Sequence, residues 1–261
     1  MIRVLDCKSF SSGDIRTTAT VLSHLLGGVS PSTLNPHEKL HLENVHWTTR
    51  TFEKGSTMIS QSESRNMISV VLSGWAFRFQ NLPDGKRQIF DFVFAGAIVG
   101  FGGGDVNYYG VEAATKCIVA TVPKSQFRRL LMGCPTLAVH VAEQVAESEM
   151  RAYEHMTSLG RRSARERVAA LIVELVSRTR FENSSMGEDM LELPVSQIMI
   201  GDALGLSNEH VCRTLGKLVN AGIIELGRHA LRVLNPLAVA QEAGLDFDHI
   251  PCTMIPEVRA A

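Results

Sequence analysis

One stretch decides how the C-terminal part of this chain folds: Ser196-Gln-Ile-Met-Ile-Gly-Asp-Ala-Leu-Gly-Leu-Ser-Asn-Glu-His-Val-Cys-Arg-Thr-Leu-Gly-Lys-Leu-Val-Asn-Ala-Gly-Ile-Ile224. Residues 197–204 are predicted to form a short helix. Gly205 then favours a left-handed helix end, and Ser207 is a typical N-cap for a second helix. Two short helices joined by such a turn predict a helix-turn-helix.

The residues around the turn support this prediction. Gly201 is small where the two helices would cross, and Val211 follows as the core anchor of the second helix. Residues 223–226 and 230–233 flank Gly227-Arg-His229 as the strands of a hairpin would, which predicts a wing. The apolar face of the second helix consists of Val211, Leu215, Leu218 and Val219.

The polar face of the second helix carries side chains that can contact DNA. The N-terminal half of a recognition helix enters the major groove. There Arg213 can donate two hydrogen bonds to guanine, and Glu209 can accept one from cytosine. An ordinary ion pair on a solvated helix would have the same i, i+4 spacing, and both roles are compatible. The predicted base-reading residues are Asn208, Glu209, Cys212 and Arg213, and the predicted phosphate contacts are Ser207, Lys217, Arg228 and Arg232.

The local charge also indicates a partner with negative charge. The whole chain has a formal net charge of −1, whereas residues 160–180 contain six arginines and two glutamates, a net +4. A basic cluster of this kind can follow a phosphate backbone. The same arginines could equally keep the surface soluble.

A long helix is predicted between Pro135 and Gly160, because neither proline nor glycine interrupts this segment. Gly160 is expected to end it. Apolar residues at heptad spacing form a stripe, in which Glu149 is the one charged residue. The stripe could pack on its own domain, but its length and small residues favour pairing with an identical helix in a homodimer. The stripe consists of Ala138, Ala142, Val145, Ala152, Met156 and Leu159, widened by Val141, Met150 and Tyr153.

Residues 47–123 have a different pattern of residue types, in which short apolar runs are separated by residues that favour turns. Ile68–Leu72 stops at Ser73-Gly74, and Pro83-Asp-Gly85 separates two alternating segments. Many short strands, separated at regular intervals by glycine-containing turns, predict a β-sandwich or β-roll. Before this region, residues 1–35 are predicted to be a flexible arm ending in a short helix.

Composition narrows the functional classes further. The 261 residues are 45% hydrophobic and 20% charged, which indicates a globular protein. The apolar runs are too short to cross a membrane, and the N-terminus does not resemble a signal peptide. The five cysteines are scattered, so the sequence predicts a cytoplasmic protein without disulfides or a metal site.

From about residue 35 to residue 240, the chain resembles the CRP/FNR (cyclic-AMP receptor protein/fumarate-nitrate regulator) transcription factors. The motifs that carry this resemblance are Leu72-Ser-Gly-Trp75, Asp84-Gly-Lys-Arg-Gln88, Ala95-Gly-Ala-Ile-Val-Gly-Phe101 and Leu204-Gly-Leu-Ser-Asn-Glu-His-Val-Cys-Arg213.

The resemblance implies an α+β fold with a β-roll of the cyclic-nucleotide-binding type, a long dimerisation helix and a winged helix-turn-helix. The expected parts are an N-terminal arm (1–35), the β-roll (36–125), the dimerisation helix (126–160), the DNA-binding domain (161–238) and a tail (239–261).

The recognition helix is most similar to the fumarate-nitrate regulator and FixK branches, whose pattern is Glu-x-x-Ser-Arg. Here it is Glu209-His-Val-Cys-Arg213, with Asn208 where the cyclic-AMP receptor branch has arginine. The resemblance implies a palindromic operator with TTGA-like half-sites. It also implies a homodimer that activates transcription through contacts with RNA polymerase.

The sensor features of the family are missing from this sequence. Its cyclic-nucleotide cassette has a glutamate where this chain has Gly103, and Glu112 stands where an arginine would pair with the phosphate. Cyclic-AMP binding is therefore not expected. An iron–sulfur cluster would need four thiolates, three of them near the N-terminus, where only Cys7 is present. No histidine is in a setting that indicates haem, so no cofactor is predicted.

Three alternatives remain open. An unidentified small molecule could gate the regulator. Oxidation of Cys212, beside the reading arginine, could weaken DNA binding. An enzyme of the cupin class would need histidines inside the β-roll, and residues 47–123 contain none.

Overall fold

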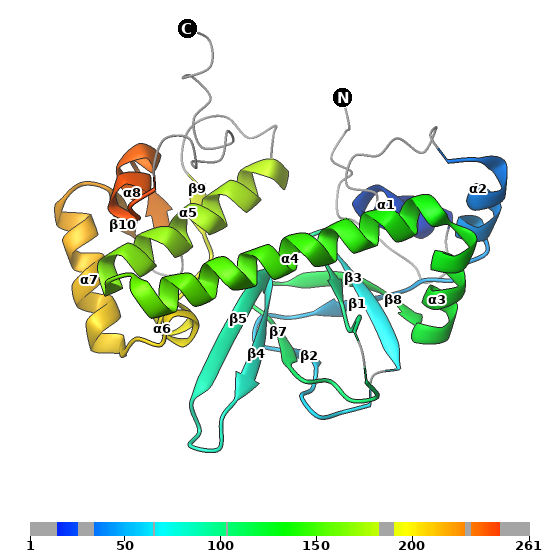
Figure 1. Ribbon diagram of the computed structural model, residues 1–261, viewed down its shortest axis with the longest axis horizontal. Coiled ribbons are helices and arrows are strands. Elements are labelled where there is room, and N and C mark those ends of the chain that lie inside the picture. The colour runs from blue at the N-terminus through cyan, green and yellow to red at the C-terminus, as the bar shows by residue number, and fades with distance from the viewer. Residues whose placement is uncertain are drawn as a thin grey trace, which may run out of the picture. The chain divides into compact units, whose positions relative to one another are not determined.

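The structure, a computed structural model, describes residues 15–25, 34–64, 66–102, 104–182, 191–227 and 231–245 (Figure 1). The chain divides into two compact units. One unit contains Met1–Arg78 and Val93–Ser148, and the other contains Phe79–Phe92 and Glu149–Ala261. The short segment Phe79–Phe92 thus groups with the C-terminal part of the chain. Each unit is described separately.

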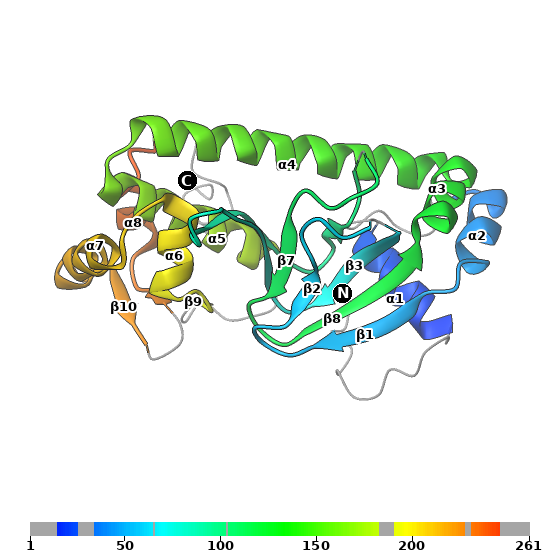
Figure 2. The same cartoon turned by 90° about the horizontal axis from the view of Figure 1, so that it is seen from below.

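The predicted β-roll is present. In one of its two sheets, β8 pairs antiparallel with β1 and with β3, and Figure 2 shows these strands side by side. Among the described residues eight strands lie between Thr48 and Pro123, in two sheets of order β1-β8-β3-β6 and β2-β7-β4-β5. Their bounds are β1 Thr48–Phe52, β2 Thr57–Ile59, β3 Met67–Ser73, β4 Ala76–Asn81, β5 Arg87–Val93, β6 Ile98–Val99, β7 Gly110–Ala113 and β8 Cys117–Pro123.

Strand β3 explains why one apolar run in the sequence does not alternate. Residues 68–72 are all buried, because each face of the strand meets a different core. Val71 faces the interior of the roll with Val119 and Cys117. Ile68 and Val70 face a second core, which includes residues of α1 (Ile15–Leu25), α2 (Pro36–Glu43) and α3 (Lys124–Gly133).

A buried carboxylate joins α2 to the start of α4 (Pro135–Arg161). Glu38 accepts hydrogen bonds from the backbone N–H groups of Asn35 and Thr136, each at 3.0 Å. The bond from Thr136 is the main reason that the pKa of the Glu38 carboxyl lies below its ordinary value. The carboxylate also lies at the positive end of a 27-residue helix, where a negative charge is favourable.

The C-terminal unit contains the helix-turn-helix and its wing. A reciprocal capping box between Ser163 and Glu166 opens α5. Strands β10, β11 and β9 form an antiparallel sheet in which Glu225 pairs with Arg232. The elements are α5 Ala164–Glu182, β9 Leu191–Leu193, α6 Gln197–Leu204, α7 Asn208–Asn220, β10 Ile224–Leu226, β11 Leu231–Val233 and α8 Pro236–Glu242.

The predicted fold class is confirmed, with two local corrections. The prediction that Gly160 ends the long helix is wrong, since α4 continues to Arg161. Gly160 has an ordinary negative φ, so the left-handed conformation that ends many helices does not occur there. On α7 the fourth buried side chain is Thr214, whereas Val219 is exposed. Within the described residues, no helix is both long and apolar enough to cross a membrane.

Candidate nucleic-acid interface

Local hydrogen bonds define both ends of α6. The hydroxyl of Ser196 accepts from the N–H of Met199 at 3.2 Å and caps the start of the helix. Gly205 ends the helix at φ +63°, in the left-handed region that glycine adopts most easily. The N–H of Leu206 then donates to the carbonyl of Gly201 at 3.1 Å. These bonds fix the turn that the sequence predicts.

Helix α7 is held by its cap and its buried face. The Ser207 hydroxyl accepts from the N–H of His210 at 3.3 Å. Val211, Leu215 and Leu218 are fully buried on one side. Because these contacts fix the rotation of α7 about its own axis, the opposite side of the helix has a defined direction.

Gly201 lies where α6 meets the turn and α7, and a Cβ there would be in ordinary contact with Val211 of α7 but much closer to the turn. A Cβ at this position would lie 2.8 Å from the carbonyl oxygen of Leu206, which is backbone and cannot easily move away. The matched comparison is Gly216 on α7, where a Cβ would meet nothing within 4 Å. We expect Gly201→Ala to lower the free energy of unfolding by about 1–3 kcal/mol, because the added methyl group overpacks the turn.

We expect Gly216→Ala to raise the same free energy by about 0.5–1 kcal/mol, because alanine loses less backbone entropy in a helix. Chemical denaturation of both full-length variants, followed by circular dichroism, measures the two changes. Equal effects of the two substitutions would show that the close approach at Gly201 does not limit stability.

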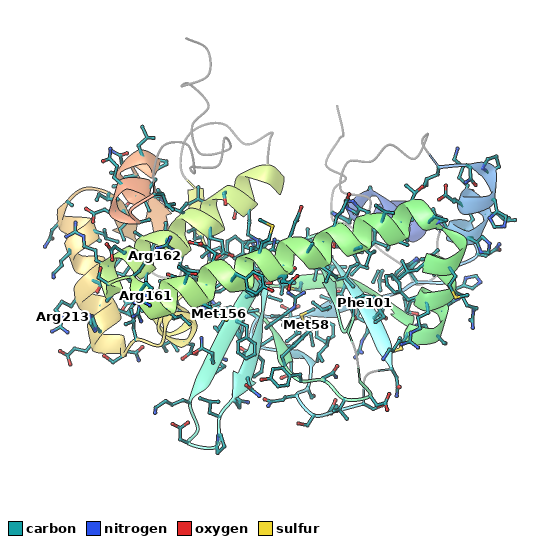
Figure 3. All side chains as sticks on the ribbon, in the orientation of Figure 1. Met58, Phe101, Met156, Arg161, Arg162 and Arg213 are labelled. Atoms are coloured by element: carbon teal, nitrogen blue, oxygen red, sulfur yellow. The ribbon has the colours of Figure 1, made fainter. Side chains whose placement is uncertain are left out.

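The four predicted base-reading residues lie together on the exposed side of α7. Asn208, Glu209, Cys212 and Arg213 all face solvent, and in Figure 3 the labelled Arg213 points away from the body of its unit. The carboxylate of Glu209 lies 3.5 Å from the guanidinium of Arg213. The i, i+4 ion pair is therefore present and leaves the arginine exposed, while base reading stays a prediction.

The predicted phosphate contacts have different environments. Ser207 is exposed at the N-terminus of α7, where backbone N–H groups favour an anion, and Lys217 is exposed further along the same helix. Arg232, by contrast, forms an ion pair with Glu225 across the wing at 2.9 Å. Arg228 lies outside the described residues.

Much of the predicted basic cluster is engaged within the protein. Arg162 pairs with Glu154 at 2.6 Å, and Arg165 pairs with Glu242 at 2.5 Å. Arg167 donates to the carbonyl of Arg162 at 2.9 Å. Arg161 is exposed and labelled in Figure 3, whereas the side chain of Arg180 is not described. The count of charges in this segment thus overstates the charge available to a partner.

The predicted stripe on α4 is largely exposed. Ala142, Val145, Ala152 and Met156 face solvent, whereas Ala138 and Leu159 are half-buried. Val141 is not part of this surface, because it is buried in the core with the helices of the roll. Tyr153 donates a short hydrogen bond to the carboxylate of Glu149, and this bond raises the pKa of the Tyr153 hydroxyl. Glu149, the one charged residue in the stripe, therefore has a hydrogen-bond partner on its own helix.

The roll contains a small pocket lined by residues of β1, β2, β3 and β8. Its volume is about 180 Å³, below the range of most ligand pockets. It is lined by Phe52, Met58 and Val119 among others, and Arg50 is the one basic residue among the lining residues that the structure describes. Among the described residues, no group of three or more His, Cys, Asp and Glu side chains could hold a metal ion. Gly103 lies outside the described residues.

Comparisons with known proteins agree with this geometry. Residues 166–241 match the family of Crp-like helix-turn-helix domains, and residues 49–134 match the cyclic nucleotide-binding domain family. The nitrogen fixation regulation protein FixK of Bradyrhizobium diazoefficiens is 32% identical over 188 residues, which are 72% of this chain and 78% of that protein.

Two further relatives extend the comparison. The transcriptional activator protein FnrL of Cereibacter sphaeroides is 28% identical over 202 residues, 76% of this chain and 82% of FnrL. The solved structure of FixK2 from Bradyrhizobium japonicum superposes with a TM-score of 0.66 at 27% identity, covering 75% of this chain and 96% of FixK2.

Proposed function

Because this chain belongs to the CRP/FNR family of DNA-binding transcription regulators, we propose that it acts as a cytoplasmic homodimer that reads an inverted repeat of TTGA-like half-sites and activates transcription. The family consists of regulators and not of enzymes, so the cupin alternative is set aside. The observation that carries the proposal is the exposed pair of Glu209 and Arg213 on a helix whose opposite face is buried.

Each residue of the reading face has a role in this proposal. Arg213 donates to the O6 and N7 atoms of a guanine, and Glu209 accepts from a cytosine amino group. Asn208 and Cys212 contact neighbouring base edges. Ser207, Lys217 and Arg228 contact phosphates, which fix the register of the protein on DNA. Arg232 can join them only if it exchanges Glu225 for a phosphate.

Dimerisation explains why the site would be a palindrome. Two copies joined along the exposed stripe of α4 would present two recognition helices about one DNA turn apart. Activation would then require a surface that contacts RNA polymerase. The relatives support this direction of control, since FnrL carries the name of a transcriptional activator.

The test is selection of bound DNA from a random pool with the ligand-free, full-length protein. We expect the recovered sequence, called the selected operator below, to be an inverted repeat with TTGA-like half-sites. Strong binding by the ligand-free protein would support a regulator that needs no effector. Binding that appears only after addition of a small molecule would favour the gated alternative. A recovered sequence without two-fold symmetry would contradict the homodimer.

Redox control through Cys212 is a second candidate, favoured by where the described cysteines lie. Cys117 and Cys134 are buried, and burial raises the pKa of each thiol. Cys212 is exposed on the reading face beside Arg213. Oxidation to a sulfinic acid would place bulk and negative charge next to DNA phosphates.

We therefore expect peroxide to weaken binding of the wild type to the selected operator. The Cys212→Ser variant is the control and should keep its affinity after the same treatment. If mass spectrometry finds Cys212 oxidised while the wild-type affinity is unchanged, the cysteine has only a spacing role.

A further inference from the structure

Strand β5 contributes two side chains to the helix-turn-helix. The Nε of Arg87 lies 2.8 Å from a carboxylate oxygen of Asp202 in the last turn of α6. The next residue, Gln88, donates through its side-chain amide to the carbonyl of Ala203 at 2.9 Å. These partners are 115 residues apart in sequence, and all of them belong to the same compact unit.

The same strand is also bound to α5. Arg178 donates to the carboxylate of Asp91 at 2.8 Å and to the carbonyl of Phe92 at 2.7 Å. Glu174, one turn earlier on α5, accepts from the same guanidinium at 2.9 Å. Arg178 and Asp91 are mostly buried, with side-chain exposures of 19% and 16%. Arg178 is one of the six arginines in the basic cluster of residues 160–180, and the structure makes it part of this internal network.

The contacts of β5 can affect the position of the recognition helix α7, because β5 binds the two helices on which α7 packs. Helix α7 packs against both α5 and α6, the two helices that β5 holds. The β5 contacts reach the C-terminal turn of α6 at Asp202 and Ala203, just before Gly205 begins the turn into α7. The base-reading side chains remain exposed while these contacts are made. The strand therefore supports α6 without covering the surface that would meet DNA.

We propose that Arg87, Gln88 and Asp91 are positioning residues for DNA binding. Together with Asp202, Ala203, Glu174 and Arg178 they form a clamp that holds α5 and α6 in the arrangement that presents α7 to the major groove. Loss of the clamp lets α6 and α7 leave that arrangement. The affinity for DNA then falls in proportion to the fraction of molecules that remain competent.

A second ion pair in the same hairpin provides a matched control. Lys86 and Asp84, in the turn between β4 and β5, form an ion pair at 2.7 Å. Their side chains are 79% and 52% exposed, whereas those of Arg87 and Asp202 are 24% and 23% exposed. Exposed pairs contribute little, because water screens them. Removing the Lys86 pair should thus change the hairpin charge without changing the clamp.

The experiment measures binding of full-length variants to the selected operator by fluorescence anisotropy. We expect Arg87→Asp and Asp202→Arg each to weaken binding about tenfold, if the competent fraction falls to about a tenth. The double variant with both changes restores the pair in reverse, and its affinity should return to within about threefold of wild type. Asp84→Asn should bind like wild type. Because the DNA is the sequence that the wild type selects, this result does not depend on the half-site or the palindrome proposed above.

Hydrogen exchange of residues 197–220 separates positioning from simple loss of fold. We expect faster exchange in α6 and α7 of the single variants, with melting temperature and dimer mass unchanged. If Arg87→Asp does not fold, Gln88→Leu decides the question, since it removes only the neutral hydrogen bonds to the carbonyls of Ala203 and Ile89 and should still weaken binding measurably. Single variants that bind like wild type or more tightly, or a double variant that binds no better than the singles, would overturn the clamp.

Discussion

Replacing Arg213 with alanine is expected to weaken binding to the selected operator by about 1–3 kcal/mol, and Glu209→Ala by a similar amount. Each substitution removes hydrogen bonds to one base. Both side chains are exposed, and Val211, Leu215 and Leu218 hold α7 from the other side. Neither change should therefore affect folding.

The measurement compares the selected operator with random DNA at one fixed salt concentration. Binding to random DNA should be nearly unchanged in both variants, because phosphates supply most of that affinity. Lys217→Ala is the matched comparison on the same helix, and as a phosphate contact it should weaken both kinds of DNA to a similar extent. Arg161→Ala changes an exposed arginine outside the helix-turn-helix and should have little effect. Equal losses of Arg213→Ala on both DNAs would refute base reading.

Much of this interface could be predicted from sequence because its signals are local. The caps at Ser196 and Ser207 and the turn at Gly205 each depend on residues within about four positions. The same is true of the capping box at Ser163. Even the close approach at Gly201 could be inferred, because the two helices that meet there are neighbours in the chain.

The long-range contacts could not be inferred in this way. Nothing near Arg87 indicates that its partner is Asp202, because the pairing depends on how two distant segments are brought together. Arg178 counts toward the basic cluster in the sequence, while in the structure its position on α5 brings it to Asp91 and Glu174. A charge count from sequence cannot distinguish an arginine that faces solvent from one that joins two elements.

The periodicity of α4 could be predicted, but its partner could not. The stripe at heptad spacing is largely exposed in a single chain, as a helix that pairs with a second copy requires. The hydrogen bond between Tyr153 and Glu149 shows how a carboxylate is tolerated beside that stripe. The second helix itself lies outside a single chain, so the dimer is tested by disrupting it.

We expect Val145→Asp to convert the protein into a monomer. Val145 lies in the stripe and is 50% exposed in the single chain. In a dimer joined along the stripe, two copies would place two carboxylates near each other in an apolar interface, where charges without partners are strongly unfavourable. Light scattering should show the mass of one chain, and affinity for the selected operator should fall by more than about a hundredfold, since one recognition helix would have to bind alone.

The matched control is Val139→Asp on the same helix. Val139 is 60% exposed, and six residues of α-helix place it about 120° around the axis from Val145. It carries the same new charge outside the six main residues of the stripe, on the side of the flanking Met150, so this variant should remain a dimer with wild-type affinity. If Val139→Asp dissociates and Val145→Asp does not, the two chains meet on another face of α4. If both variants remain dimers, the interface does not depend on this helix, and the spacing of two recognition helices on a palindrome must be set by other contacts.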